Sequence, residues 1–257
     1  MLRPKRKKSV LISMLIFQVL FSSYKTLIPV KEFTPAPEGF ALVELFTSEG
    51  CSSCPPADEA IGRLKNWKNN VYVLSYHVDY WNYLGWKDVF SNSAFSSRQQ
   101  TYGDLFHLGS IYTPQIVVNG KDQFVGSDET RLRESIENNL KEIPKTELQI
   151  KVQPANKNQL AVLWTTNPNP ELKMNLALVQ NFTQDHIQRG ENKGRTLNHY
   201  FTVRDFKSLQ LNSGLNTTFL NIPNGLQPSD CTIVAFLQNP KTGYIIAATQ
   251  YSGETLK

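Results

Sequence analysis

A pair of cysteines lies between an apolar run and a helical pattern, and this arrangement limits the folds that the chain can adopt. Residues 41–46 form a short apolar run, which is typical of a buried strand. Cys51 and Cys54 come after a brief loop, and Pro55 and Pro56 open a segment whose apolar residues have helical spacing. A first helical turn tolerates proline because its N–H groups lack partners within the helix. The sequence therefore predicts a strand, a loop that holds both cysteines, and a helix.

The elements that follow predict a mixed sheet. We expect helices over 57–66 and 93–108, a third helix that Ser127 or Asp128 caps and that includes Leu140, and strands over 71–76, 115–118 and 122–125. Asn119-Gly120 is a strong hairpin signal between the last two strands. This order of strands and helices indicates that the first two strands pair in parallel and that the hairpin is antiparallel. Helices are expected on both faces of the sheet.

A second pattern begins after residue 143. Pro144 and Lys145 end the first pattern, and seven short strands with alternating apolar and polar residues are expected beyond them. These strands cover residues 147–153, 159–165, 174–181, 199–204, 216–221, 232–239 and 244–250. Strands of this number and spacing indicate a β-sandwich. We therefore expect an α/β domain over 38–143, followed by an all-β, sandwich-like domain over 146–251.

The N-terminus has the pattern of an export signal. Five Lys and Arg lie in the first eight residues, and an apolar stretch follows at 10–21. This stretch is shorter than the roughly 20 apolar residues that a membrane-spanning helix needs. We expect residues 1–23 to be a signal peptide or an N-terminal anchor, and residues 24–37 to be a linker. The protein is then periplasmic or extracellular, and it contacts a membrane only if the leader stays uncleaved.

The net charge of +5 comes from this leader. The remaining 22 Lys and Arg balance 22 Asp and Glu, so the rest of the protein is close to neutral. The sequence has no basic stripe that would release counterions from a phosphate backbone. The charge pattern therefore argues against a nucleic-acid partner.

The Cys-x-x-Cys pair has more than one chemical interpretation. A zinc site needs two further ligands, but Cys231 is the only other cysteine and the four histidines have no ligand spacing. A pair at the start of a helix favours redox chemistry, because the helix N-terminus stabilises a thiolate. Cys51 is then the attacking residue, and Cys54 resolves the mixed disulfide. Cys231 lies in an apolar run and is expected to be an inert core residue.

The order of elements, the cysteine pair after the first strand and Thr113-Pro114 before the third strand together resemble the thioredoxin fold. The resemblance implies that Pro114 is a cis-proline beside the redox pair and that the backbone of Thr113 holds an extended peptide. Thioredoxins also carry a buried acid on the first strand, where this chain has Glu44. Glu44 is therefore a candidate catalytic residue that takes the proton from Cys54, or else an acid paired with a lysine at the sheet edge.

Longer motifs sharpen the resemblance. They lie at residues 43–58, 77–81, 84–86, 98–99 and 112–115. Over about residues 40–130 the chain looks like a secreted bacterial thioredoxin-like family known as domain of unknown function 1223. Residues 189–192 and 198–199 also look like a region found in such proteins. By composition alone, we expect a solvated loop over 189–195.

Side chains after the second strand are candidates for substrate binding. His77 and Asp79 follow that strand at the end of the sheet where the redox pair is expected. His77 would tune the Cys51 thiolate or accept a proton, or else it is an ordinary hydrogen-bonded residue. The expected groove is lined by His77, Asp79, Trp81, Trp86, Arg98, Tyr112, Thr113 and Pro114. The alternative is that the aromatic residues form core under a long loop.

These features predict an exported thiol–disulfide oxidoreductase that acts on protein or small-molecule disulfides. Its partners would be exported protein thiols and disulfides, or a membrane electron donor or acceptor. We expect no cofactor besides the Cys51–Cys54 disulfide, and no metal site. Two alternatives stay open. One is a copper-binding module that uses Cys51, Cys54 and His77, and the other is a non-catalytic secreted binding protein.

Overall fold

The computed structural model describes residues 39–255 except 66, 145 and 168. The described residues belong to one unit, Ala36–Lys257. The helices are α1 (Pro55–Gly62), α2 (Ser93–Leu105) and α3 (Glu129–Leu140). The strands are β1 (Ala41–Thr47), β2 (Val71–His77), β3 (Gln115–Val118), β4 (Asp122–Val125), β5 (Ile150–Asn156), β6 (Gln159–Thr166), β7 (Lys173–His186), β8 (Thr196–Gln210), β9 (Gly214–Asn221), β10 (Cys231–Gln238) and β11 (Ile245–Ser252).

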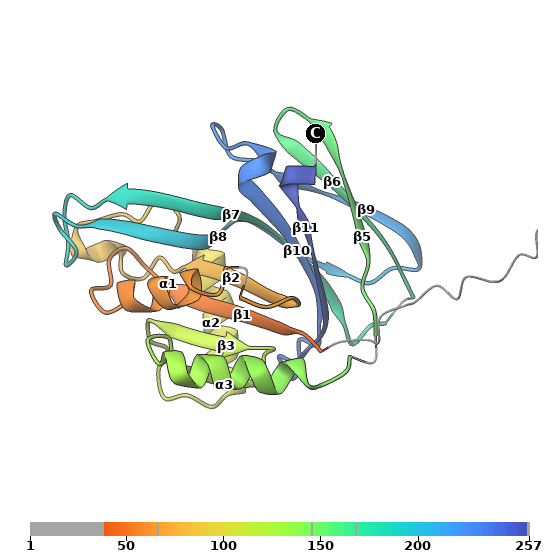
Figure 1. Cartoon of the computed structure of the whole chain (residues 1–257), viewed down its shortest axis with the longest axis horizontal. Helices are drawn as coiled ribbons and strands as arrows, with labels where there is room; N and C mark the ends of the chain where they lie inside the picture. The colour runs from red at the N-terminus through yellow and green to blue at the C-terminus, as the bar shows by residue number, and fades with distance from the viewer. Residues whose placement is uncertain (1–38, 66, 145, 168, 256–257) are drawn as a thin grey trace, which may run out of the picture. The chain divides into compact units, whose positions relative to one another are not determined.

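Eight strands form one mixed sheet in the order β11-β10-β7-β8-β2-β1-β3-β4 (Figure 1). β1 pairs in parallel with β2, which places Thr47 opposite His77 at the carboxyl ends of both strands. β3 runs antiparallel to β1, and β4 returns antiparallel along β3. Asn119 and Gly120 have φ angles of 49° and 65°, as the hairpin between β3 and β4 requires. The pairings predicted for the first half of the chain are confirmed.

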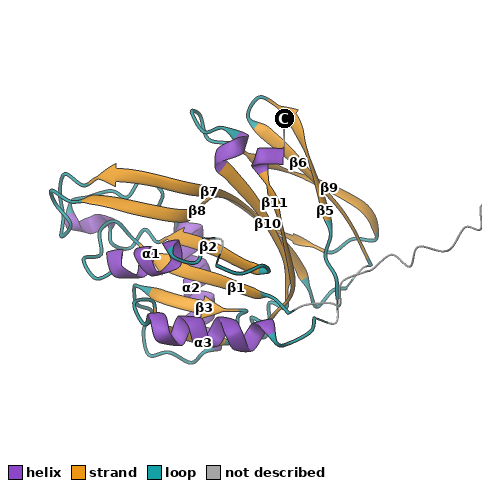
Figure 2. Ribbon diagram, viewed as in Figure 1, coloured by secondary structure: helices purple, strands orange, loops and turns teal. Residues whose placement is uncertain are grey.

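Helices cover both faces of this part of the sheet (Figure 2). The side chains of β1 alternate, so Leu42 and Phe46 face the core that α2 covers, whereas Val43 and Leu45 face the core under α1 and α3. α2 contributes Phe95 and Tyr102 to the first core, and α1 and α3 contribute Ala57, Ile61, Leu132 and Ile136 to the second. Their helical spacing is the signal that located these helices in the sequence.

The second half of the chain differs from the expected arrangement. β7, β8, β10 and β11 extend the first sheet, and only β5, β6 and β9 form a separate sheet. The small sheet packs on β7 and β10 through a core that includes Leu160, Leu176 and Ile233. Two sheets therefore do face each other, but one of them continues into the α/β part. The junction pairs Ser75 of β2 with Thr202 of β8, and it covers backbone groups that an open edge of β2 would leave unpaired.

β7 and β8 are longer than the sequence pattern predicted. They contain 14 and 15 residues, whereas the alternation indicated only 174–181 and 199–204. Their outer halves pair from Phe182 opposite Tyr200 to His186 opposite Thr196. This part of the hairpin carries polar side chains on much of its surface, so it has little of the alternation that identifies a strand. The added length brings residues 187–195 to the loop that follows β1.

Residues 1–38 lie outside the described part of the chain, and so do the signal peptide or anchor at 1–23 and the linker at 24–37. No helix among the described residues is long and apolar enough to cross a membrane. The expectation of export therefore rests on the sequence alone.

Candidate redox site

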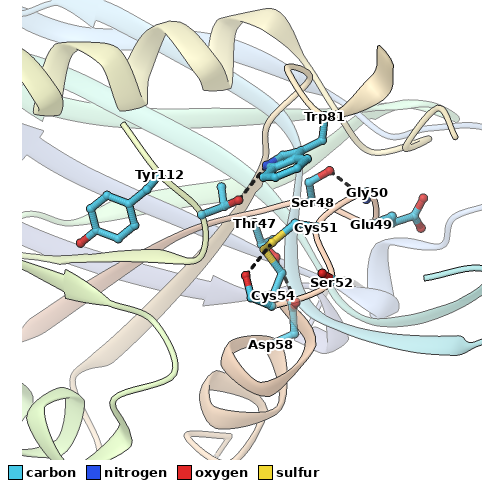
Figure 3. Close-up of a disulfide and its surroundings, with 12 residues drawn as sticks. Thr47, Ser48, Glu49, Gly50, Cys51, Ser52, Cys54, Asp58, Trp81 and Tyr112 are labelled. Carbon is cyan, nitrogen blue, oxygen red and sulfur yellow. Dashed lines mark hydrogen bonds between the residues drawn. A yellow bond between two sulfur atoms is a disulfide. The ribbon is translucent and has the colours of Figure 1, made fainter. Parts of the chain in front are cut away.

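The predicted cysteine pair is joined in a disulfide at the carboxyl end of β1 (Figure 3). Cys51 lies in the loop after β1, and Cys54 immediately precedes α1, which begins with two prolines. The backbone amides of Ala57 and Asp58 donate hydrogen bonds to the carbonyl oxygen of Cys54 at 2.9 and 3.2 Å. The helix therefore starts at the second cysteine, and its electropositive N-terminus lies at the disulfide.

Both cysteines are buried, although the residues between them are exposed. Cys51 is 1% exposed and Cys54 is 0% exposed, whereas Ser52 and Ser53 are on the surface. The Cys51 Sγ lies 3.4 Å from the Ser53 hydroxyl. An external thiolate therefore reaches the sulfurs only after part of their cover moves.

The tip of the β7–β8 hairpin forms part of this cover. Asn192 is 0% exposed, and its Nδ2 donates to the carbonyl oxygens of Glu49 and Cys51, both at 2.9 Å. Glu191 accepts a hydrogen bond from the Ser52 amide at 3.1 Å, and its hydrogen bonds with Ser52 lower the pKa of the carboxyl. The solvated loop expected over 189–195 is therefore wrong at Asn192, which is buried. Glu191 is exposed, as expected, but it also holds the cysteine loop.

Residues of two loops predicted to bind substrate lie together. Trp81 Nε1 donates to the Thr113 hydroxyl at 2.8 Å. Trp81 also packs on Gly50, where an added Cβ would lie 2.9 Å from the Trp81 Cβ. The Thr113–Pro114 peptide bond is cis, as the resemblance implied. Tyr112 extends away from the disulfide (Figure 3), and its hydroxyl donates to a β4 glutamine at 2.7 Å.

Trp86 and Asp79 have separate partners. Trp86 Nε1 donates to Glu49 Oε2 at 2.7 Å, and the Trp86 side chain packs against Gly190 in the hairpin tip. Trp86 therefore links the loop after β1 to the tip of the β7–β8 hairpin. Asp79 accepts a hydrogen bond from the Ser96 hydroxyl at 2.5 Å, which attaches the loop after β2 to α2.

Glu44 and Arg98 form an ion pair on the α2 face of the sheet. The Arg98 Nε and Nη2 atoms lie 2.5 and 2.9 Å from the two Glu44 carboxylate oxygens. The Tyr102 hydroxyl donates to the same carboxylate at 2.6 Å. Glu44 shares this face with Leu42 and Phe46, on the side of the sheet opposite α1. Glu44 is thus paired with Arg98 rather than with a lysine, and β1 is an inner strand of the sheet rather than an edge.

A cluster of buried histidines and acids lies at the carboxyl ends of β1 and β2. His77 is 0% exposed, and its Nδ1 lies 2.7 Å from Asp88 Oδ2. Burial by itself would raise the pKa of Asp88, but His77 and two backbone amides bring it below its usual range. The rings of His77 and His199 lie 4.9 Å apart, edge to face. His199 Nε2 lies 3.2 Å from Glu49 Oε1, although the ring N–H is not aligned for a hydrogen bond.

Asp58 joins this cluster from the first turn of α1. Its side chain points toward Thr47 and the disulfide (Figure 3), and the Thr47 hydroxyl donates to Oδ2 at 3.0 Å. Burial raises the pKa of Asp58 to about 7, although His199 and the Thr47 hydrogen bond oppose this effect.

The sequence analysis assigned no role to several residues of this site. They are Glu49, Asp58, Asp88, Asn192 and His199. An acid one helical turn after Cys54 was a usable signal for Asp58, since that position faces the start of the helix. Asn192 and His199 lie far along the chain from the cysteines, and only the long hairpin brings them here.

The third cysteine lies apart from the redox pair. Cys231 is a free cysteine at the start of β10, and it is buried. Burial raises the pKa of its thiol to about 12. A protonated, buried thiol is unreactive, which agrees with the inert core role predicted from the sequence.

Fold and site together define an α/β protein with a Cys-x-x-Cys disulfide between its first strand and first helix. The family model described as "Protein of unknown function (DUF1223)" matches residues 42–238. The chain belongs to this family, as its motifs predicted.

One solved structure covers nearly the whole described chain. Protein AGR_C_4864 from Agrobacterium tumefaciens is 27% identical, with a TM-score of 0.64, and the match covers 86% of this chain and 98% of that one. A domain of the outer membrane lipoprotein Omp28 from Porphyromonas gingivalis is 11% identical over 40% of this chain and 91% of that one. Its TM-score of 0.26 is too low to carry an argument. The search of curated proteins finds no match.

Proposed function

We propose that this protein is an exported thiol–disulfide oxidoreductase whose redox centre is the Cys51–Cys54 pair. The observation that carries the proposal is the disulfide itself, which closes a two-residue loop at the start of α1. So small a loop adds little stability by restricting the unfolded chain. At a helix N-terminus, the same bond has a leaving thiolate that the helix stabilises. The position thus suits exchange chemistry better than a structural link.

The arrangement of the first half supports a thioredoxin-like fold. Its four strands have the order β2-β1-β3-β4, with β3 and β4 antiparallel. α2 covers one face, and α1 and α3 cover the other. Pro114 immediately precedes β3, and its carbonyl oxygen accepts a hydrogen bond from Gly126 at 2.9 Å. The antiparallel hairpin, the helices on both faces and the position of Pro114 before β3 agree with what the sequence led us to expect, and they support the proposal.

The chemistry follows thiol–disulfide exchange. A substrate thiolate attacks the Cys51 Sγ, the Cys51–Cys54 bond breaks, and Cys54 leaves as a thiolate. The mixed disulfide joins Cys51 to a substrate sulfur. A second substrate thiolate attacks that substrate sulfur, and Cys51 leaves as a thiolate. The substrate gains a disulfide, the enzyme gains two electrons, and the two protons from the substrate thiols pass to the cysteines or to water. The reverse sequence reduces a substrate disulfide.

The same proposal defines the partners of the protein, which would meet it outside the cytoplasm. The substrates are thiols or disulfides of exported proteins, or small-molecule disulfides. A membrane electron donor or acceptor restores the pair after each turnover. Trp81 and Thr113 would contact an incoming peptide, since their side chains are joined beside the cysteine loop.

The test is the reduction potential of the full-length protein. The chain is equilibrated with thiol buffers of stepped potential, and the free thiols are then trapped and counted by mass. We expect a two-electron transition with a midpoint between about −120 and −270 mV, the range of known thiol–disulfide catalysts. A midpoint below about −300 mV would indicate a structural bridge and contradict the proposal.

Cys231 provides the matched control. Cys231→Ser removes one thiol but should leave the midpoint unchanged, because this residue lies outside the redox pair. Cys51→Ser and Cys54→Ser should each abolish the two-thiol transition. If Cys231→Ser abolished it instead, the redox pair would be wrongly assigned.

A further inference from the structure

Three buried side chains converge beside the disulfide from separate elements. They are Asp58 of α1, His77 at the end of β2 and His199 of β8, which are 3%, 0% and 1% exposed. One potential ligand atom of each lies within 4.8 Å of the other two. The amide of Asp58 donates to the Cys54 carbonyl oxygen at 3.2 Å, so this cluster lies one helical turn from the redox pair.

Each residue of the cluster has a side-chain atom with no hydrogen-bond partner among the described residues. These atoms are Asp58 Oδ1, His77 Nε2 and His199 Nδ1. His199 Nε2 makes no hydrogen bond either, but it lies 3.2 Å from Glu49 Oε1. Buried polar atoms in folded proteins are nearly always paired, so these unpartnered atoms in one cluster require an explanation. A carboxylate oxygen and two imidazole nitrogens together form a set of electron-pair donors, and such a set binds a cation.

Hydrogen bonds from neighbouring residues orient His77 and Asp58 so that each keeps one atom available to bind an ion. Asp88 binds His77 Nδ1 at 2.7 Å, which leaves the His77 Nε2 lone pair free. The Thr47 hydroxyl holds one oxygen of Asp58 at 3.0 Å, while the other oxygen has no partner. A metal-bound histidine usually donates its second ring N–H to a carboxylate in this way.

Charge also favours a cation here. Glu49 and Asp88 are 0% and 1% exposed, so together with Asp58 they form a group of three buried acids. One Asp58 oxygen accepts from the Thr47 hydroxyl, but the other has no partner among the described residues. A divalent ion would supply the missing positive charge, because buried acids need a cationic partner or a metal.

We propose that Asp58, His77 and His199 bind a divalent transition-metal ion. Two imidazole nitrogens and one carboxylate oxygen suit Zn²⁺ or a similar ion and leave a coordination position open. The site needs no cysteine, which separates it from a copper module built on Cys51 and Cys54. It goes beyond the proposed redox function, and either proposal can fail without the other.

The test is metal binding by the full-length protein with its disulfide oxidised. The protein is treated with a chelator and titrated with Co²⁺ or Zn²⁺. Because the site is buried, a second sample is unfolded and refolded with the ion present. We expect one ion per chain, visible Co²⁺ absorption bands, and a higher melting temperature with saturating Zn²⁺. A protein that takes up no ion from millimolar solution by either route would overturn the proposal.

Variants assign the ligands. His77→Gln and His199→Gln should each weaken Zn²⁺ binding more than about 100-fold, since losing an outer partner alone costs roughly 10- to 100-fold. Melting curves of the ion-free variants show whether they still fold, and Asp58→Asn is a third, independent variant. His107→Gln and His186→Gln change exposed histidines and should leave affinity and stoichiometry unchanged. Binding that survives in both His77→Gln and His199→Gln would show that the ion lies elsewhere.

Discussion

Replacing Glu44 with alanine is expected to lower the free energy of unfolding by about 3–5 kcal/mol, because it leaves the Arg98 guanidinium buried without its partner. The Arg98 side chain is 13% exposed. Its Cζ lies 5.3 to 5.6 Å from the ring centroids of Tyr76, Tyr102, Phe206 and Phe236. The rings partly compensate the charge, but they do not replace two carboxylate hydrogen bonds. Urea denaturation measures the loss.

The double variant Glu44→Leu/Arg98→Met tests whether the loss comes from the unpaired charge. It removes both charges and should be more stable than Glu44→Ala, because apolar residues often replace a buried pair at little cost. A double variant as unstable as Glu44→Ala, or a loss below about 1 kcal/mol in the single variant, would contradict the structural role of the pair.

A second substitution at this position distinguishes a structural role of Glu44 from a role as proton acceptor for Cys54. Glu44→Gln keeps the shape of the side chain and removes its charge. If Glu44 only stabilises the fold, the folded fraction of this variant exchanges disulfides at nearly the normal rate. If Glu44 accepts the proton of Cys54, exchange falls by at least the roughly 100-fold that a general base typically contributes. The rate per folded molecule is the measurement that decides.

The first half of the fold was predictable because its signals are local. The apolar run that became β1, the helical spacing of Ala57 and Ile61, and the turn at Asn119-Gly120 each act over a few residues. The second half depends on pairing between distant strands. Nothing local in β8 indicates that Thr202 pairs with Ser75 of β2 rather than within a separate sandwich. Register and sheet membership there are decided by tertiary packing.

The residues of the candidate site likewise include some that the sequence predicts and others that depend on distant parts of the chain. Cys51 and Cys54 are predictable because their spacing and their position before a helix have a chemical meaning. The sequence places His77 at the carboxyl end of β2, but it does not indicate its partner Asp88. The glycines and charges around Asn192 predict a solvent-exposed loop, although this residue is buried. The burial of Asn192 depends on the length of the β7–β8 hairpin. The sequence does not indicate this length, because polar residues in the outer half of the hairpin interrupt the strand pattern.

Replacing Asn192 with aspartate is expected to accelerate reduction of the disulfide by a small thiol about 10- to 100-fold. Aspartate has the same shape but cannot donate the two hydrogen bonds to the carbonyl oxygens of Glu49 and Cys51. Each such bond contributes about 1 kcal/mol net, and the new carboxylate repels both oxygens. Because the sulfurs are buried, attack requires the hairpin tip to open, and its rate rises with the open fraction. Thiol release after mixing with excess dithiothreitol gives the rate.

Lys193→Ala is the matched control, because Lys193 is exposed in the same hairpin tip, and its variant should be reduced at the normal rate. The rate of re-oxidation then identifies what Asn192 does. If Asn192 only controls access, opening the tip accelerates reduction and re-oxidation equally, and the reduction potential is unchanged. If Asn192 stabilises the oxidised loop itself, re-oxidation lags behind and the potential rises. A normal reduction rate for Asn192→Asp would mean that attack takes another route, and the Trp81 side of the cysteine loop would be the remaining candidate, since Trp81 packs directly on Gly50.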